Sequence, residues 1–169
     1  MGPSNDSHTL DFRSAPGFNV VLVEPEIPPN TGNIARLCLA TDSTLHLIRP
    51  LGFSIDDRAL KRAGLDYWKE TKVVVWDSLA ALQARYPEGR FWYLTTKSDR
   101  PYYETTFRPG DFLVFGRESK GLPEPLLRKY PEQLLTIPMS GKTRSLNLAT
   151  AVAIVLFEGV RQQRIAGTR

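Results

Sequence analysis

Short runs of apolar residues alternate along this chain with longer segments in which apolar positions recur at helical spacing. The short runs are nearly continuous rather than alternating, which is typical of strands buried on both faces of a parallel sheet. The pattern predicts six strands: Phe18–Glu24, Leu45–Ile48, Val73–Trp76, Phe91–Thr95, Phe112–Phe115 and Leu134–Ile137. Helical segments between several of these strands indicate an α/β fold, a parallel sheet covered by helices on both faces.

The first helical segment follows a proline-rich turn after the first strand. Asn30 is placed as its N-cap, because asparagine is favoured at that position. Its inward stripe holds Ile34, Leu37, Cys38 and Thr41. Further helices are expected around Leu79–Arg85, Pro123–Tyr130 and Leu146–Gln163, the last one long and mostly buried.

The composition is that of one soluble globular domain. The chain has 169 residues, of which 41% are hydrophobic and 24% are charged. Residues 1–17 are polar and aperiodic, so we expect a flexible N-terminal tail before a single domain over residues 18–169. No secretory signal is visible, and the most apolar stretch, Leu148–Phe157, has about half the length that spans a bilayer. We therefore expect a cytoplasmic protein without a membrane segment.

Cysteine and histidine are too scarce to build a disulfide or a metal centre. Cys38 is the only cysteine, which excludes an intramolecular disulfide and a cysteine-built zinc site. The two histidines, His8 and His46, are isolated from each other, and His46 is expected to be an ordinary strand residue. We expect no metal ion in this protein.

Positive charge is gathered in two groups. The net charge is +4, which allows a polyanionic partner but is also ordinary for solubility. Arg58, Lys61 and Arg62 lie at i, i+3 and i+4 of a helical stretch over residues 57–64, so they share one face. Lys142 and Arg144 form the second group, in a loop. A solvated helix face explains the first group without any ligand, whereas an RNA partner would make both groups phosphate contacts.

Three loops that follow predicted strands are rich in glycine, proline and polar residues. They read PEIPPNTGN after the first strand, GRESKGLP after Phe115 and PMSGKTRSLN after Ile137. Ligands of open α/β sheets bind where such loops leave the carboxyl ends of the strands. None of the loops carries the glycine pattern of a dinucleotide site or the elbow of a serine hydrolase. Gly141-Lys142-Thr143 imitates the end of a phosphate-binding P-loop, but Thr136 stands where that motif needs glycine.

Three short motifs occupy these loops in a fixed order. They are N-x-G-x-x-x-R over Asn30–Arg36, F-G-x-E-x-x-G-L over Phe115–Leu122, and I-P-M at Ile137–Met139 followed by S-x-N-x-A at Ser145–Ala149. Together they resemble the motifs of the tRNA ribose 2′-O-methyltransferases of the SPOUT superfamily, and the resemblance runs from about Phe18 to Gln163. The segments EPEIPPNTGNIARLC and RAGLDYW look most like the small branch of that family, which methylates the wobble nucleotide of tRNA.

The resemblance implies a fold, a cofactor and a set of site residues. Such enzymes tie the C-terminal third of the sheet into a deep trefoil knot, bind S-adenosylmethionine inside it and work as homodimers. The substrate implied is the wobble cytidine or uridine in the anticodon stem-loop of leucine tRNAs. Carried onto this sequence, the cofactor pocket is Leu94, Gly116, Ile137 and Ser145. The matching catalytic and RNA-facing residues are Asn30, Arg36, Glu118, Ser145 and Asn147.

Arg36 and Glu118 each have a functional and a structural interpretation. Arg36 is placed near the inner stripe of its helix, and its guanidinium suits a bidentate grip on an RNA phosphate. Because arginine holds its proton far above neutral pH, we expect it to orient the phosphate and the 2′-hydroxyl rather than to act as a base. The alternative is a surface arginine paired with a carboxylate. Glu118 either helps to position an Arg36 supplied by the partner subunit or forms a salt bridge with Arg117 or Lys120.

Asn30 and Ser145 also have both a functional and a structural interpretation. Asn30 either caps its helix or contacts the ribose or the second subunit, and Ser145 either serves the site or caps the terminal helix. For the whole protein, the alternatives are a 2′-O-methyltransferase that acts on another tRNA or ribosomal position, and a non-catalytic RNA-binding module.

Overall fold

The structure is a computed structural model that describes residues 17–56, 58, 62 and 67–167. The expected tail, apart from Gly17, and the predicted RNA-contacting Lys61 lie outside the described residues. Among the helices that are described, none combines the length and the apolarity needed to cross a lipid bilayer.

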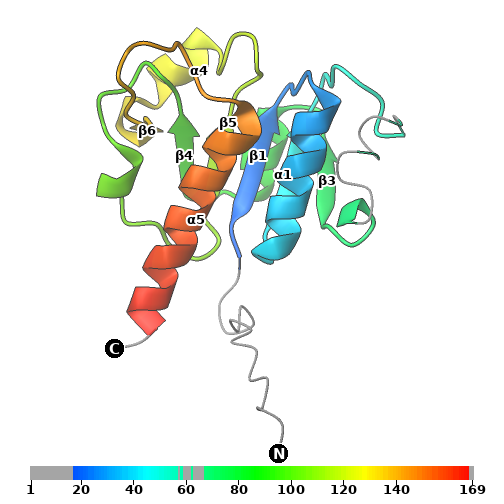
Figure 1. Ribbon diagram of the computed structural model, residues 1–169, viewed down its shortest axis with the longest axis horizontal. Coiled ribbons are helices and arrows are strands. Elements are labelled where there is room, and N and C mark those ends of the chain that lie inside the picture. Colours follow the sequence, from blue (N-terminus) through cyan, green and yellow to red (C-terminus); the bar gives the residue numbers. More distant parts are fainter. Residues whose placement is uncertain (1–16, 57, 59–61, 63–66, 168–169) are drawn as a thin grey trace, which may run out of the picture.

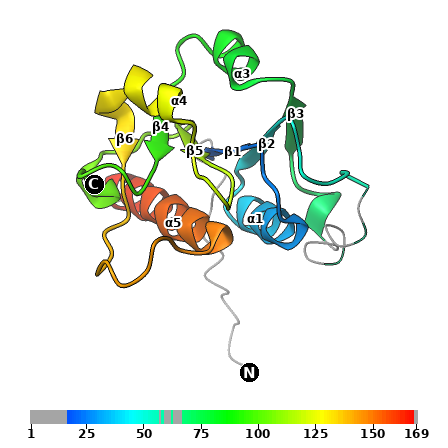
Figure 2. The ribbon, with the colours of Figure 1, turned by 90° about the horizontal axis from the view of Figure 1, so that it is seen from above.

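Within the described residues, six strands form one parallel sheet in the order β3-β2-β1-β5-β4-β6. The strands are β1 Asn19–Val23, β2 Thr44–Ile48, β3 Val73–Trp76, β4 Phe91–Leu94, β5 Phe112–Phe115 and β6 Leu134–Leu135. The helices are α1 Pro28–Ala40, α3 Leu79–Arg85, α4 Glu124–Lys129 and α5 Leu148–Gly167, with 3-10 turns η2 Tyr102–Glu104 and η3 Pro131–Gln133. Helices α1 and α5 cover one face of the sheet, and α3 and α4 cover the other (Figures 1 and 2). The predicted α/β fold is confirmed.

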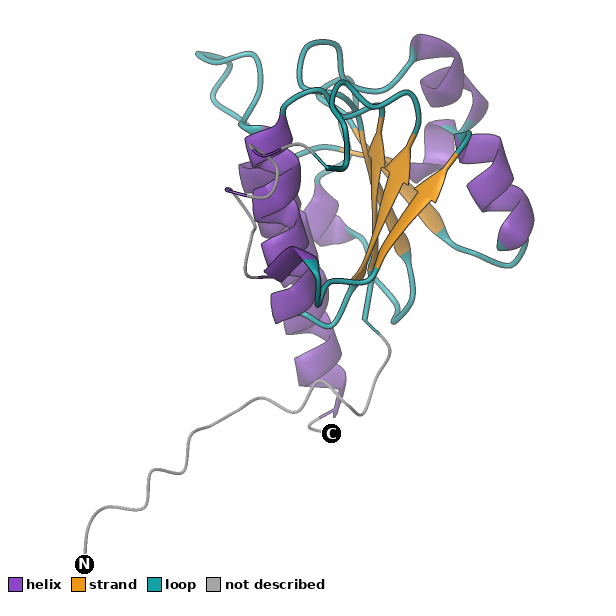
Figure 3. Cartoon of the chain, turned by 90° about the vertical axis from the view of Figure 1, so that its right-hand side faces the viewer, coloured by secondary structure: helices purple, strands orange, loops and turns teal. Residues whose placement is uncertain are grey.

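Most residues of the central strands β1, β2 and β5 are buried because both faces of the twisted sheet are covered (Figure 3). Successive side chains of a strand point to opposite faces. In β1, Val20 and Leu22 therefore pack in the core with α1 and α5, whereas Val21 and Val23 pack in the core with α3 and α4. Each fully buried aliphatic side chain of this kind contributes about 1.5–3 kcal/mol to folding.

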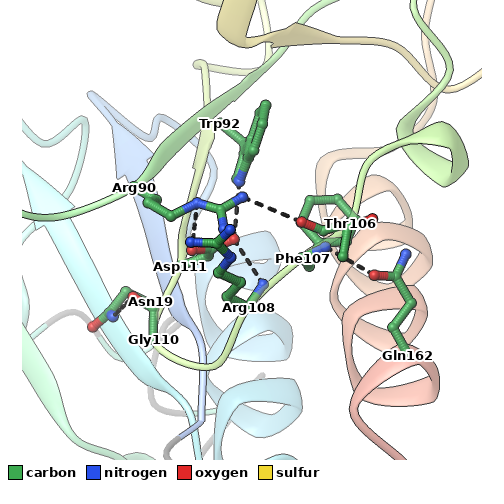
Figure 4. Close-up of polar contacts among 9 residues, drawn as sticks. All are labelled: Asn19, Arg90, Trp92, Thr106, Phe107, Arg108, Gly110, Asp111 and Gln162. Carbon is green, nitrogen blue, oxygen red and sulfur yellow. Dashed lines mark hydrogen bonds and ion pairs between the residues drawn. The ribbon is translucent and has the colours of Figure 1, made fainter. Parts of the chain in front are cut away.

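A buried carboxylate fixes the amino-terminal end of the sheet, opposite to the three loops. Asp111 accepts hydrogen bonds from Trp92 Nε1 at 3.0 Å and from the backbone nitrogen of Arg108 at 2.9 Å. It also forms an ion pair with Arg90, whose Nε lies 3.4 Å from its Oδ1. Gln162 of α5 binds the same loop by accepting from the backbone nitrogen of Phe107 at 2.8 Å (Figure 4). These contacts anchor the C-terminal half of α5, so that its N-terminus is held at the opposite end of the sheet.

Two predicted helix starts are wrong. α1 begins at Pro28 with Ile27 as the N-cap, so Asn30 lies inside the first turn rather than at the cap. Prolines are favoured in a first turn because they lack the backbone N–H that would be left unpaired there. α5 begins at Leu148, and its cap is not Ser145 but Asn147, whose Oδ1 accepts from the backbone nitrogen of Thr150 at 3.3 Å.

The last strand is shorter than predicted. β6 ends at Leu135, and Thr136 instead forms an isolated parallel bridge with Pro101. The other strands lie within one residue of their predicted bounds at each end, and α3 matches its prediction.

A buried histidine makes the stability of the fold sensitive to pH. His46 of β2 accepts a hydrogen bond at Nδ1 from Trp76 Nε1 at 3.0 Å, and its Nε2 lies 2.9 Å from Asn19 Oδ1. The neutral ring with its proton on Nε2 satisfies both contacts, and protonation of Nδ1 would break the first. Burial lowers the pKa of His46 from 6.5 to about 4.

We expect this histidine to destabilise the fold in acid. Because the folded pKa lies below the unfolded value, the unfolded chain binds the proton first, and stability is lost as the pH falls from 6.5 towards 4. The loss is about 3 kcal/mol by pH 4. Urea unfolding at pH 7 and pH 4.5 should show a smaller pH-dependent loss for His46→Gln, which cannot titrate, than for the unaltered protein. Equal losses in the two proteins would contradict the assignment.

Candidate active site

The three loops predicted to carry a site meet at the carboxyl ends of β1, β4, β5 and β6. They enclose a cavity of about 550 Å³, a size that suits a small-molecule cofactor. The four residues predicted for the cofactor pocket, Leu94, Gly116, Ile137 and Ser145, all line this cavity. Asn30, Glu118 and Asn147 line it as well, so the fold brings together seven of the residues predicted for catalysis and cofactor binding.

The loop after β5 forms a tight backbone wall of this cavity. A side chain at Gly116 would overlap the carbonyl carbon of Gly121 and the backbone nitrogen of Leu122. The backbone nitrogen of Gly121 donates to the carbonyl oxygen of Arg117 at 2.8 Å, and Gly121 has a φ of +66°. The loop therefore folds back on itself in a shape that glycine permits at both positions.

Glu118 joins this loop to the N-terminus of α1. Its Oε2 accepts from the backbone nitrogen of Glu26 at 2.8 Å, and its Oε1 accepts from the backbone nitrogen of Ile27 at 3.1 Å. A carboxylate is stabilised here because the first N–H groups of a helix are unpaired and carry partial positive charge. The alternative interpretation of Glu118, a salt bridge with Arg117 or Lys120, is wrong, since within the described chain neither cation lies within ion-pair distance of it.

Glu26 completes a reciprocal contact that sequence reasoning missed. Its Oε1 accepts from Ser119 Oγ at 2.6 Å and from the backbone nitrogen of Ser119 at 3.0 Å. These hydrogen bonds lower the pKa of the Glu26 carboxyl, and the nearby charges of Arg117 and Lys120 lower it further. The first loop thus holds the second through Glu26, while the second holds the first through Glu118. The sequence signal that could have indicated this contact is the position of Glu26, two residues before the pair of prolines at which α1 begins.

Asn30 connects Glu118 to the start of α5. Its Nδ2 donates to Glu118 Oε1 at 3.4 Å, and its Oδ1 accepts from Asn147 Nδ2 at 3.1 Å. Asn147 in turn caps α5 through Thr150. Residues from all three motifs are therefore linked side chain to side chain beside the cavity, and Asn30 is 8% exposed there.

Arg36 is not part of this group. It lies six residues after Asn30 on α1, which places it about 240° around the helix. Its side chain is exposed, and its guanidinium carbon lies 5.0 Å from the ring centroid of Tyr67. The prediction that Arg36 lies near the inner stripe is wrong, because Ile34, Ala35 and Cys38 fill that stripe. No carboxylate among the described residues pairs with it.

The predicted RNA-contacting cations have different positions. Arg144 lines the cavity, and Lys142 is exposed in the same loop. Arg58 and Arg62 are exposed helical residues. The shared face predicted for Arg58, Lys61 and Arg62 includes residues outside the described part of the chain.

The cavity suits a flat, apolar group held by backbone atoms. Leu94, Phe115, Leu122 and Ile137 give apolar walls, and the loop at Gly116 packs so closely on the main chain of Gly121 and Leu122 that no side chain fits there. This lining fits the adenosine part of S-adenosylmethionine, the predicted cofactor. Within the described residues, no group of three or more histidine, cysteine, aspartate or glutamate side chains is placed to hold a metal ion.

The chain is similar to known proteins over most of its length. A family model described as the SpoU rRNA Methylase family matches residues 17–157. A tRNA (cytidine(34)-2'-O)-methyltransferase from Burkholderia pseudomallei (strain 1106a) is 48% identical over 154 residues, which cover 89% of this chain and 98% of that protein. A solved structure described as "Structural insights into the 2-OH methylation of C/U34 on tRNA" is 47% identical, with a TM-score of 0.83, and covers 87% of this chain and 96% of that chain.

The fold is also similar to that of a solved structure with lower sequence identity. The SpoU methyltransferase AviRb from Streptomyces viridochromogenes, in complex with the cofactor AdoMet, is 24% identical with a TM-score of 0.76. The match covers 89% of this chain and 59% of that chain.

Proposed function

The chain belongs to the SpoU rRNA methylase family, and on that premise we propose that it transfers a methyl group from S-adenosylmethionine to a ribose 2′-hydroxyl of tRNA. The target is the wobble nucleotide, cytidine or uridine 34, as named for relatives that are 47–48% identical over nearly their whole length. The resemblance drawn from the three sequence motifs is confirmed at the level of the family. The observation that carries the proposal is the joining of those motifs around one cavity.

The cavity residues hold and orient the cofactor. Leu94 and Ile137 would pack against the flat ring of its adenine, and the main chain at Gly116 would supply hydrogen-bonding groups without side-chain bulk. S-adenosylmethionine supplies a methyl group that is already activated by the positive charge of its sulfonium. The protein therefore has mainly to align the donor and the acceptor, and such orientation can lower a barrier by about 7–11 kcal/mol. The side-chain hydrogen bonds that join Glu118, Asn30 and Asn147 hold the three loops around the cavity in fixed relative positions.

Arg36 contacts the RNA at a site shared between two subunits. On its own chain Arg36 lies on the exposed side of α1, away from the cavity. The same face of the sheet carries α5, which exposes Phe157 at 45%. A second copy packed on α1 and α5 would cover Phe157 and could bring Arg36 to the partner's cavity. There the guanidinium would grip the phosphate beside the target ribose, in a homodimer.

The finer features of the proposal concern the knot, the substrate and the compartment. The chain passes from β6 at the edge of the sheet to α5 beside α1 at its middle, a path that supports a C-terminal trefoil knot. The anticodon stem-loop of leucine tRNAs is the substrate we infer, with Arg58, Lys61, Arg62, Lys142 and Arg144 as phosphate contacts. Because its relatives are named as tRNA methyltransferases and tRNA is used in the cytoplasm, we place the protein there.

Methyl transfer from labelled S-adenosylmethionine tests the activity. We expect purified tRNA that lacks its wobble methylation to gain one 2′-O-methylated cytidine or uridine, mapped to position 34 by nucleoside mass spectrometry. The same tRNA with a 2′-deoxy nucleotide at that position is the matched control and should accept nothing. Transfer to ribosomal RNA alone would contradict the substrate, and binding of RNA without any transfer would contradict the activity.

Light scattering after size exclusion tests the dimer. The mass should be that of two 19.0 kDa chains at micromolar concentration. A mass of one chain would remove the shared site and the role of Arg36 in it.

A further inference from the structure

A second cavity, of about 650 Å³ and more open to solvent, lies directly beside the cofactor cavity. Thr96, Thr136, Ile137, Met139 and Arg144 line both, so the two spaces share a wall. The second cavity contains no residue that was assigned to the cofactor except Ile137. Its position is therefore next to the cofactor, where a substrate would lie.

One wall of this second cavity is Tyr103, which belongs to η2. At 54% exposure it is the most exposed of the large hydrophobic side chains in the described part of the chain. More than half of the surface of this tyrosine is left in water, where its apolar ring adds little to the stability of the fold. Tyrosine and other aromatic rings are, however, the usual surfaces on which unstacked RNA bases stack.

The support of Tyr103 is fixed although its ring is exposed. The backbone nitrogen of Tyr102 donates to the carbonyl oxygen of Thr136 at 2.9 Å. The backbone nitrogen of Thr136 in turn donates to the carbonyl oxygen of Arg100 at 2.8 Å. The ring of Tyr102 meets the ring of Tyr103 edge to face, with centroids 5.2 Å apart. The exposed ring is thus held by the segment that also lines the cofactor cavity, which limits the entropy lost when a base stacks on it.

The charge around the second cavity suits a nucleotide. Arg144 stands at the wall shared by the two cavities, and Lys142 is exposed between Gly141 and Thr143, which both line the second cavity. The carboxylate of Asp99, which also lines the second cavity, can accept a hydrogen bond from an exocyclic amine of a base. An arginine for a phosphate, an aromatic ring for a base and a polar acceptor therefore line one space.

We propose that this second cavity receives one unstacked base of the anticodon loop, at or next to the methylated nucleotide, with Tyr103 as its stacking surface. The inference rests on the proposed function and assigns Tyr103 to substrate binding. It does not assign any part of the cofactor to this cavity.

Kinetics with Tyr103 variants and altered tRNA test this assignment. Tyr103→Ala is expected to raise KM for tRNA about 5- to 150-fold, the effect of losing one base–aromatic stack. The kcat and the affinity for S-adenosylhomocysteine should stay near their original values, and Tyr103→Phe should restore KM. Tyr86→Ala, which truncates an exposed tyrosine at the end of α3, is the control and should leave KM for tRNA unchanged.

A set of altered RNAs identifies the stacked base. Each tRNA carries one ribose abasic nucleotide, which keeps its 2′-hydroxyl, at the wobble position or at one of the two neighbouring positions. For one of the three RNAs, Tyr103→Ala should cause no further loss, because the base that stacks is already absent.

Three results would overturn the assignment without affecting the proposed function. The first is that KM does not rise in Tyr103→Ala. The second is that the losses from Tyr103→Ala and from base removal multiply for all three RNAs. The third is a weakening of S-adenosylhomocysteine binding as large as the rise in KM, which would assign Tyr103 to the cofactor. Failure of the unaltered protein to methylate any tRNA would instead overturn the proposed function.

Discussion

Arg36→Ala is expected to lower kcat for methyl transfer by about 100-fold, the effect of misplacing a reacting group by about 1 Å. Affinity for S-adenosylhomocysteine should not change, because Arg36 does not line the cavity of its own chain and would grip the RNA phosphate, not the cofactor, at the partner's. The measurement is single-turnover transfer from labelled S-adenosylmethionine to tRNA, with cofactor affinity determined separately by calorimetry. Wild-type rates in the variant would exclude Arg36 from the reaction and with it the shared site.

Arg36→Lys separates orientation of the RNA from proton removal. A lysine keeps the positive charge but loses the planar, two-point grip on a phosphate. We expect part of the activity to remain, with the pH optimum of the unaltered protein. A displaced pH optimum would indicate that the side chain at this position takes the proton from the 2′-hydroxyl.

The central strands could be predicted from the sequence because their apolar runs face the core on both sides. In β5 every residue is buried, and the run Phe112–Phe115 coincides with the strand. The local pattern of apolar residues was sufficient to predict a strand wherever burial in the core determined its bounds. It was insufficient at Leu134–Ile137, where Thr136 leaves the strand to pair with Pro101, a contact between segments 35 residues apart in the sequence.

The three motifs were sufficient to predict which residues line the cavity. They were not sufficient to predict which of these residues contact one another. Glu118 lies in a basic loop, so local charge favoured Arg117 or Lys120 as its partners. The fold instead places it on the backbone of Glu26 and Ile27, more than 90 residues away in the sequence. Unpaired amides at a helix start can be anticipated, but which distant carboxylate reaches them depends on the strand order.

The first turn of α1 shows how two local preferences compete. Asparagine is favoured as an N-cap, and proline is favoured in the first helical turn. Two prolines precede Asn30, and they move the start of the helix ahead of it. Asn30 is thereby released from capping its own helix, and its amide joins Glu118 to Asn147 instead.

The second large effect is expected at Gly116. In Gly116→Ala the new methyl group would overlap the backbone of Gly121 and Leu122, which cannot yield as the end of a flexible side chain can. The loop must shift, and overpacking of this kind costs up to about 3 kcal/mol. We expect this shift to distort the wall of the cavity and to lower the affinity for S-adenosylhomocysteine about 100-fold. Calorimetry measures that affinity.

A matched control separates loss of the wall from general strain. Gly110→Ala forces alanine to a φ of +83° but meets no atom within 4 Å, and Gly110 lies at the amino-terminal end of the sheet (Figure 4). It should lower the melting temperature and leave cofactor affinity unchanged. Unaltered affinity in Gly116→Ala would show that the loop after β5 is not a wall of the cofactor site.

Mixed dimers of the two variants join both predictions in one result. Gly116→Ala chains keep Arg36 but lose the cavity, and Arg36→Ala chains keep the cavity but lose the guanidinium. If each site takes its cavity from one subunit and Arg36 from the other, co-expressed chains form one intact site in every mixed dimer. With random pairing, about one quarter of the original activity should return, although each variant alone is nearly inactive. Sites built within single chains would give no recovery, because every chain in the mixture carries one of the two defects.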